Sequence, residues 1–189
     1  MKITALIQAR MGATRLPGKV LMDLAGEPML SRMMHRVQRS RLIDEIVIAT
    51  TVSNRDSDIS FLCLRNGWKS FAGDELNVLQ RFYSASLCFP ADVYLRLTAD
   101  CPLIEPHIID KVIEEFISNH VDYASNTLVQ TYPRGLDVEV FTRESLKKTW
   151  LLAKLPLELE HVTPYMRNHP EIFKLLNIPC IVDSWKDMR

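Results

Sequence analysis

The sequence predicts an α/β protein, a three-layer sandwich in which helices cover both faces of a mostly parallel central sheet. Short apolar runs alternate along the chain with stretches of helical periodicity, as in repeated strand–helix–strand units. The chain has 189 residues, is 47% hydrophobic and contains no repeat or Pro/Gly-rich linker. Because this length suits one buried core, we expect a single domain over residues 1–189.

The predicted strands are short runs rich in aliphatic and aromatic side chains. Such nearly continuous apolar runs are typical of parallel strands that are buried on both faces. The predicted strands are Ile3–Gln8, Glu45–Thr50, Trp68–Phe71, Asp92–Thr98 and Leu136–Phe141.

The predicted helices lie between these strands and have recognisable ends. Asp56 and Ser57 can cap a helix N-terminus, Gly67 can end the same helix, and Pro106 suits the first turn of another. The predicted helices are Met29–Arg39, Asp56–Asn66, Leu76–Cys88, Pro106–Asn119 and Arg143–Lys154.

The overall charge argues against several classes of protein. The 23 basic and 23 acidic side chains cancel, so we expect neither general nucleic-acid binding nor attachment to a membrane surface. The four cysteines show no zinc-site spacing, and no apolar run approaches the roughly 18 residues of a membrane span. We therefore expect a cytoplasmic protein with reduced thiols.

A loop rich in cations follows the first predicted strand. It carries Arg10, Arg15 and Lys19 together with two glycines. Glycines let backbone amides approach a phosphate, and guanidinium and ammonium groups pair with its oxygens. The loop lacks the Gly-Lys-Ser/Thr ending of the ATPase P-loop. We interpret it as a different kind of triphosphate site.

An acidic residue follows another predicted strand. Ligands of such sheets bind beyond the carboxyl ends of the strands, where the polar segments Thr50–Asn54 and Thr98–Pro102 lie. A carboxylate such as Asp100 suits a hard divalent cation, although a lone Asp after a strand is often a turn residue or a helix cap. Because the cationic loop should face the same crevice, we favour a magnesium site at Asp100.

Several blocks of sequence, in the same order along the chain, carry a family resemblance. On these blocks the chain resembles the cytidylyltransferases that make CMP-activated acidic sugars (the acylneuraminate cytidylyltransferase-like proteins), and most closely their spore-coat polysaccharide biosynthesis branch. The blocks are Ile7–Leu21, Ile46–Thr51, Arg96–Ile104, Asp122–Asn126, Tyr132–Phe141 and Glu160–Tyr165.

The resemblance implies a nucleotide-diphospho-sugar transferase fold, which is GT-A-like and Rossmann-like. It also implies a reaction in which CTP loses pyrophosphate to a sugar hydroxyl. The loop with Arg10, Arg15 and Lys19 would grip the triphosphate, and Asp100 would hold Mg²⁺; these four are the expected catalytic residues. The nucleotide-binding residues that the resemblance implies are Gln8, Ala9, Arg10, Met11, Gly12, Arg15, Lys19, Thr50, Gly73 and Thr98.

The later blocks resemble the part of the family site that binds the sugar. Asp137 and Glu139, two apart on a predicted strand, should share a face and could hold sugar hydroxyls, or be ordinary exposed acids. Glu160 and His161 should begin a helix on which Tyr165 shares the face of His161. The sugar-binding residues implied are Arg134, Asp137, Glu139, Glu160, His161 and Tyr165.

The segment Val182–Arg189 is similar to the start of a family segment that continues into a strand, an Asp that is the second metal ligand, and a last helix. Because that continuation does not follow here, we expect CTP to bind and pyrophosphate to be released slowly. Two alternatives remain: an enzyme that uses another nucleoside triphosphate, and a catalytically impaired relative that acts as a nucleotide-binding or dimerisation partner. The resemblance also makes a homodimer plausible.

Overall fold

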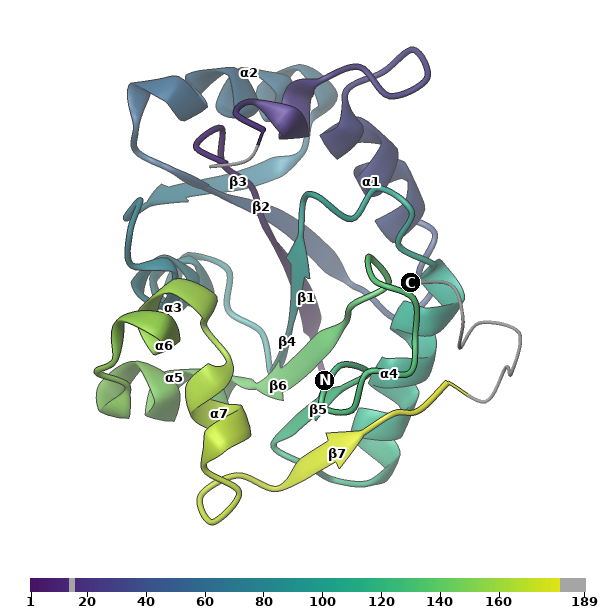
Figure 1. The fold of residues 1–189 in the computed structure, drawn as a ribbon, viewed down its shortest axis with the longest axis vertical. Coiled ribbons are helices and arrows are strands. Elements are labelled where there is room, and N and C mark those ends of the chain that lie inside the picture. The colour runs from purple at the N-terminus through teal and green to yellow at the C-terminus, as the bar shows by residue number, and fades with distance from the viewer. Residues whose placement is uncertain (14–15, 181–189) are drawn as a thin grey trace.

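The computed structural model describes residues 1–13 and 16–180. Helices pack on both faces of a central sheet, so the molecule has three layers (Figure 1). Across the sheet, the described strands follow the order β3 (Lys69–Gly73), β2 (Glu45–Thr51), β1 (Ile3–Gln8), β4 (Val93–Thr98), β6 (Glu139–Thr142), β5 (Tyr123–Ser125) and β7 (Leu175–Asn177).

The sheet is mostly parallel, as the sequence predicts. Strand β1 is central and pairs in parallel with both β2 and β4, and β2 pairs in parallel with β3. Strand β6 runs antiparallel to its neighbours β4 and β5, while β5 and β7 are parallel. The carboxyl ends of β1, β2 and β4 therefore meet at one edge of the sheet, where ligands of such folds bind.

One face of the sheet is covered by α1 (Met29–Val37), α2 (Ser57–Asn66) and α4 (Pro106–Ser118). These helices bury apolar side chains against the sheet because each has an apolar stripe at helical spacing. Figure 1 shows α1 and α4 on one side of the sheet. The buried side chains of this layer include Met33, Ile59 and Ile109.

The other face is covered by α3 (Val78–Cys88), α5 (Arg143–Leu152) and α7 (Pro164–Asn168), with α6 (Pro156–His161) beside α3. Figure 1 shows these four helices grouped on the side of the sheet opposite α1 and α4. Two apolar cores thus enclose the sheet and hold its carboxyl edge in place.

The predicted helix ends are largely confirmed. Gly67 adopts a left-handed backbone (φ 67°) and ends α2, and Pro106 occupies the first turn of α4. Asp56 precedes α2, but its side chain makes no capping hydrogen bond and is buried instead. The prediction that Asp56 caps the helix is therefore wrong.

Two predicted elements near the carboxyl edge differ in the structure. The strand expected over Leu136–Phe141 begins only at Glu139, so Asp137 precedes it. His161 ends α6 instead of beginning a helix, because Val162 takes a backbone φ of 69° that interrupts it. Tyr165 consequently lies on the separate helix α7 and does not share a helix face with His161.

Some predicted features lie outside the described residues. These are Arg15 in the cationic loop and the segment Val182–Arg189. Within the described parts of the chain, no helix is long and apolar enough to cross a membrane.

Candidate functional site

Two adjoining cavities open at the carboxyl edge of the sheet. The first, of about 740 Å³, is lined by residues that follow β1 and β4, including Arg10, Lys19 and Asp100. The second, of about 380 Å³, lies beside β6 and α7 and includes Glu139 and Arg167. We call the two together the crevice. The residues that line both cavities are Arg96, Thr98, Asp137 and His161.

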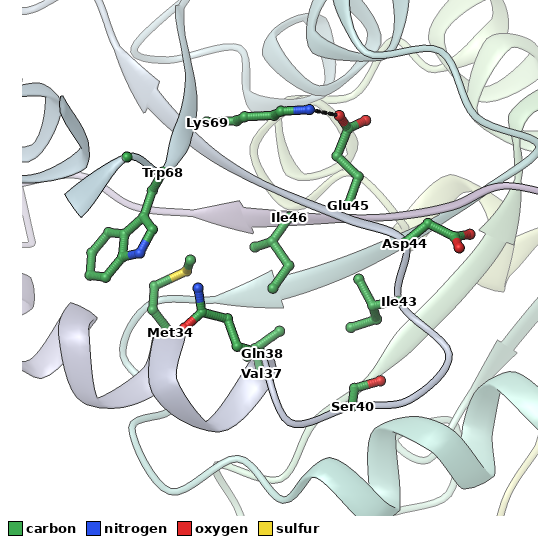
Figure 2. Close-up of a pocket in the computed structure, with 11 residues that line it drawn as sticks. Met34, Val37, Gln38, Ser40, Ile43, Asp44, Glu45, Ile46, Trp68 and Lys69 are labelled. Atoms are coloured by element: carbon green, nitrogen blue, oxygen red, sulfur yellow. Dashed lines mark hydrogen bonds and ion pairs between the residues drawn. The ribbon is translucent and has the colours of Figure 1, made fainter.

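A separate pocket of about 280 Å³ lies at the opposite end of β2, beside α1 (Figure 2). Trp68, Met34 and Ile46 form its apolar wall. Its most buried carboxylate, Glu45, is paired with Lys2 at 2.8 Å and also with Lys69. Because these charges are satisfied and lie away from the strand carboxyl ends, we place the functional site in the crevice.

The loop after β1 is held by an acid from a distant part of the sequence. Oδ1 of Asp56 accepts a hydrogen bond of 2.7 Å from the Met11 backbone amide, and its Oδ2 accepts one from the Thr51 hydroxyl. The Gly18 amide donates to the Met11 carbonyl at 2.8 Å, and Gly18 has a left-handed φ of 74° that favours glycine. These bonds fix the course of the described part of the loop.

Lys19, which was predicted to bind phosphate, and Asp100, which was predicted to bind the metal, face each other. Nζ of Lys19 lies 2.6 Å from Oδ2 of Asp100. Burial alone would raise the pKa of Asp100, but the hydrogen bond and charge of Lys19, aided by Thr98, outweigh it and lower the pKa. Asp100 is therefore ionised at neutral pH.

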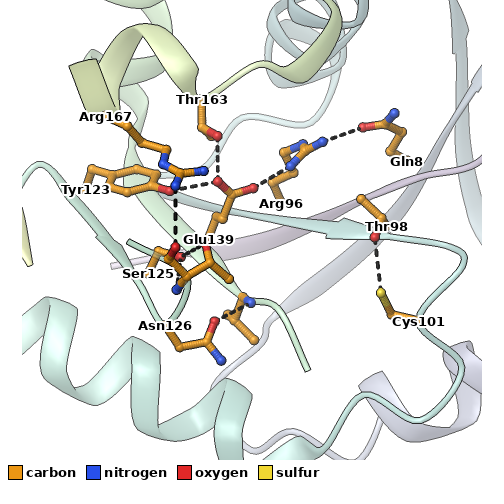
Figure 3. A network of polar contacts seen from close by, with 12 residues as sticks. Gln8, Arg96, Thr98, Cys101, Tyr123, Ser125, Asn126, Glu139, Thr163 and Arg167 are labelled. Atoms are coloured by element: carbon orange, nitrogen blue, oxygen red, sulfur yellow. Dashed lines mark hydrogen bonds and ion pairs between the residues drawn. The ribbon is translucent and has the colours of Figure 1, made fainter. Parts of the chain in front are cut away.

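Arg96 and Glu139 form the centre of a buried polar network (Figure 3). The Arg96 guanidinium donates to Oε2 of Glu139 at 2.5 Å and to Oε1 of Gln8 at 3.2 Å. Glu139 also accepts hydrogen bonds from Tyr123 at 2.7 Å and Thr163 at 2.5 Å. Burial opposes ionisation of Glu139, yet Arg96, Thr163 and Tyr123 together lower its pKa. Glu139 is thus a fixed anion that orients Arg96.

Asp137 has a different environment from these paired acids. Its Oδ1 is buried and has no hydrogen-bond partner among the described residues. Burial, followed by the charge of Glu139, raises the pKa of Asp137, and only Arg134 and Gln130 oppose this. A buried acid oxygen without a donor costs stability, and such groups occur often at functional sites.

Two arginines and a histidine complete the lining of the crevice. Arg134 lines the first cavity, Arg167 the second, and His161 both. All three side chains are exposed, and among the described residues neither arginine forms an ion pair with an acid. They can therefore contact an anionic ligand without first losing a carboxylate partner.

Not every predicted residue lines the crevice. Thr50 is fully buried in β2, and Tyr165 stacks on His169 with ring centroids 4.0 Å apart. Glu160 lies 3.7 Å from Arg10 at the surface. The predicted residues that line neither cavity are Ala9, Met11, Gly12, Thr50, Gly73, Glu160 and Tyr165.

The remaining predicted residues that the structure describes are brought together in the crevice. Several residues that line or support the site were not predicted. Gln8, Arg10, Lys19, Thr98, Asp100, Arg134, Asp137, Glu139 and His161 line one or both cavities. Five residues that line or support the site were not predicted from the sequence: Asp56, Arg96, Tyr123, Thr163 and Arg167. Of these, Arg96 carried a signal, since a cation inside an apolar strand needs a buried partner.

Comparison with known proteins identifies relatives over nearly the whole chain. A model of the cytidylyltransferase family matches residues 4–184. The spore coat polysaccharide biosynthesis protein SpsF of Bacillus subtilis is 35% identical over 178 residues, which cover 92% of this chain and 73% of SpsF. The 3-deoxy-manno-octulosonate cytidylyltransferase of Geobacter sulfurreducens is 35% identical over 126 residues, 63% of this chain and 47% of that protein.

A solved structure shows the same arrangement. The structure of a cytidylyltransferase from Leptospira borgpetersenii superimposes with a TM-score of 0.93 at 36% sequence identity. The match covers 98% of this chain and 79% of the Leptospira chain.

Proposed function

Because the chain belongs to the cytidylyltransferase family, we propose that it transfers CMP from CTP to a hydroxyl of an acidic, keto-acid-type sugar and releases pyrophosphate. The observation that carries this proposal is the first cavity, which Arg10 lines together with the Lys19–Asp100 pair at the carboxyl ends of β1 and β4. The relationship to SpsF supports a place in surface polysaccharide biosynthesis.

The triphosphate would lie against the loop after β1. Arg10 and Lys19 line the cavity there and supply charge-assisted hydrogen bonds to phosphate oxygens. Arg15 would add a third cation. Binding would require Lys19 to exchange its 2.6 Å contact with Asp100 for contact with phosphate.

The donor set fits a magnesium ion that arrives with the nucleotide. The described residues contain no group of three or more His, Cys, Asp or Glu side chains that could hold a metal by themselves. Mg²⁺ commonly takes one or two carboxylates and fills its other positions with water and phosphate oxygens. Asp100, ionised and lining the cavity, would be its protein ligand. When bound, the ion would neutralise charge on the phosphates.

The sugar would occupy the second cavity. Arg96, His161 and Arg167 line it and present positive or hydrogen-bonding groups to an acidic sugar. Arg134 approaches from the first cavity. Since the oxygens of Glu139 already accept from three side chains, its part would be to hold Arg96 in place. This arrangement would bring a sugar hydroxyl next to the nucleotide.

The protein would then promote the transfer mainly by positioning the substrates and stabilising charge, with little covalent catalysis. Holding the sugar oxygen in line with the α-phosphorus removes much of the entropic barrier, and fixed cations stabilise the charge that develops on pyrophosphate. Lys19 and Arg10 are placed to do the latter.

The direct test is to measure pyrophosphate release with each of the four nucleoside triphosphates and a panel of keto-sugar acids. We expect release with CTP and at least one acid, and a CMP-sugar as the product. Preference for another nucleotide would contradict the assignment of CTP. Nucleotide binding without release for any pair would instead favour a non-catalytic binding partner.

A further inference from the structure

The boundary between the two cavities marks where two bound substrates would meet. Arg96, Thr98, Asp137 and His161 line both cavities, so a ligand in either one lies beside them. If the nucleotide occupies the first cavity and the sugar the second, as the proposed function requires, the attacking hydroxyl and the α-phosphorus adjoin these residues. The inference below rests on that proposed function.

Among the boundary residues, Asp137 is best placed to accept a proton. Arg96 is a cation without an acceptor, and the Thr98 hydroxyl lies 3.3 Å from the Cys101 thiol. His161 is exposed at the end of α6, where solvent competes for its ring. Asp137 alone offers a buried oxygen, Oδ1, that accepts no hydrogen bond from a described residue.

The other acids of the crevice are already engaged. Asp100 is paired with Lys19 at 2.6 Å in the free protein, and in the proposed function it would hold the magnesium ion instead. Glu139 accepts hydrogen bonds from Arg96, Tyr123 and Thr163. An oxygen held by such donors has little basicity left for a substrate proton, since hydrogen bonds to the charged form stabilise it.

We propose that Asp137 is the general base of the transfer. As the sugar hydroxyl oxygen bonds to the α-phosphorus, its proton moves to Oδ1 of Asp137. The bond from the α-phosphorus to the bridging oxygen breaks, and its electron pair leaves with pyrophosphate. Solvent then takes the proton from Asp137 and regenerates the carboxylate, so no further reactant is needed.

The surroundings of Asp137 suit this role. Burial and the charges of Glu139 and Asp100 raise the pKa of Asp137, which makes its carboxylate a stronger proton acceptor than an exposed aspartate. Arg134 limits the rise. The titratable side chains that line the two cavities together with Asp137 are Arg10, Lys19, Arg96, Asp100, Cys101, Arg134, Glu139, His161 and Arg167.

The test compares Asp137→Asn with the wild type, using CTP, Mg²⁺ and a panel of keto-sugar acids that includes 3-deoxy-manno-octulosonate. Loss of a general base should lower kcat about 10²- to 10⁴-fold, while CTP affinity and the magnesium concentration needed for half-maximal binding stay unchanged. Asp137→Glu should recover part of kcat. Asp58→Asn, the same chemical change on the exposed face of α2, is the matched control and should behave as wild type.

Stability provides a second readout. Because the pKa of Asp137 is raised in the folded state, its stabilising contribution is present below its ordinary value of 3.8 and is lost as the pH rises through the folded value. At neutral pH the charge therefore costs stability, and Asp137→Asn should melt at the same or a higher temperature. If Asp137 instead stabilised the fold, Asp137→Asn would melt at a lower temperature than the wild type.

Three results would overturn the inference. They are kcat of Asp137→Asn within about tenfold of wild type, a rise in the magnesium requirement that marks a metal ligand, and a fall in melting temperature that marks a structural role. If the wild type releases pyrophosphate from no nucleotide and sugar pair, the proposed function fails and this inference fails with it. If the wild type is active, the results for Asp137→Asn test only the role of Asp137 as general base.

Discussion

Nζ of Lys19 lies 2.6 Å from Oδ2 of Asp100, so the cation and the acid at the mouth of the crevice are paired before any ligand binds. The two residues are far apart in sequence and meet because β1 and β4 are parallel neighbours whose carboxyl ends lie together. The pair keeps both charges in place in the free protein. In the proposed function, a magnesium nucleotide would replace this pair with two new contacts, phosphate on Lys19 and metal on Asp100.

Replacing Lys19 with Ala should weaken CTP binding roughly tenfold to hundredfold, because a charge-assisted hydrogen bond contributes about 1.5–3 kcal/mol. Titration calorimetry with CTP and Mg²⁺ would measure this. Lys147→Ala, on the exposed side of α5, is the control for loss of one positive charge and should leave the affinity unchanged. Equal affinities for all three proteins would remove Lys19 from the phosphate site.

Replacing Asp100 with Asn should make CTP binding independent of magnesium and abolish turnover, since an amide is a poorer ligand for a hard cation. The measurement is CTP affinity at a series of Mg²⁺ concentrations, with pyrophosphate release beside it. The loss of charge also frees Lys19, so affinity for CTP without magnesium should not fall. Wild-type turnover by the variant would show that Asp100 is only a turn residue.

The architecture was predicted well because the central strands are nearly continuous apolar runs that alternate with stretches of helical periodicity. Strand β1 and the helices α1 to α5 coincide with their predicted positions to within a few residues. The three-residue strands β5 and β7 and the short helix α6 were not predicted, and the helix expected to begin at Glu160 is the shorter α7, because such short segments show no periodicity. Their positions depend on tertiary packing: β5 lies between β6 and β7, α6 packs against α3, and α7 contacts α5 and α6.

The site was predicted in part, for a related reason. Residues in the segments that follow strands, such as Lys19 after β1 and Asp100 after β4, can be predicted from the order of strands and loops. The partners of Glu139 could not be inferred, since Arg96, Tyr123 and Thr163 reach it from three separate elements. Likewise, a sequence cannot show that Asp56 turns away from its own helix toward the loop after β1.

Replacing Asp56 with Ala should loosen the loop after β1. The Met11 amide and the Thr51 hydroxyl would both lose their acceptor, at a cost of about 1–3 kcal/mol for each buried group left unsatisfied. We expect a lower free energy of unfolding in urea and weaker CTP binding. Asp58→Ala, two residues on and exposed, is the control. Unchanged CTP affinity would show that this anchor does not shape the nucleotide site.

Replacing Glu139 with Gln should destabilise the protein strongly. The variant leaves the Arg96 guanidinium buried without its anion, and breaking a buried ion pair on one side costs about 3–5 kcal/mol. Urea unfolding at neutral pH would measure this. The double replacement Arg96→Met with Glu139→Gln, which removes both charges, should recover part of the loss. A loss of the same size in the double variant would show that the ion pair is not what matters.

The stability lost in Glu139→Gln should depend on pH. The reason is that the pKa of Glu139 is lowered below its ordinary value of 4.5 in the folded protein. The stabilising contribution of its charge is fully present above pH 4.5 and is lost as the pH falls through the lower folded value. The difference in unfolding free energy between wild type and Glu139→Gln should therefore be constant near neutral pH and shrink below pH 4.5. A difference that stays constant on acidification would mean that the variant fails through packing, because Glu139 is the one titratable group in which the two proteins differ.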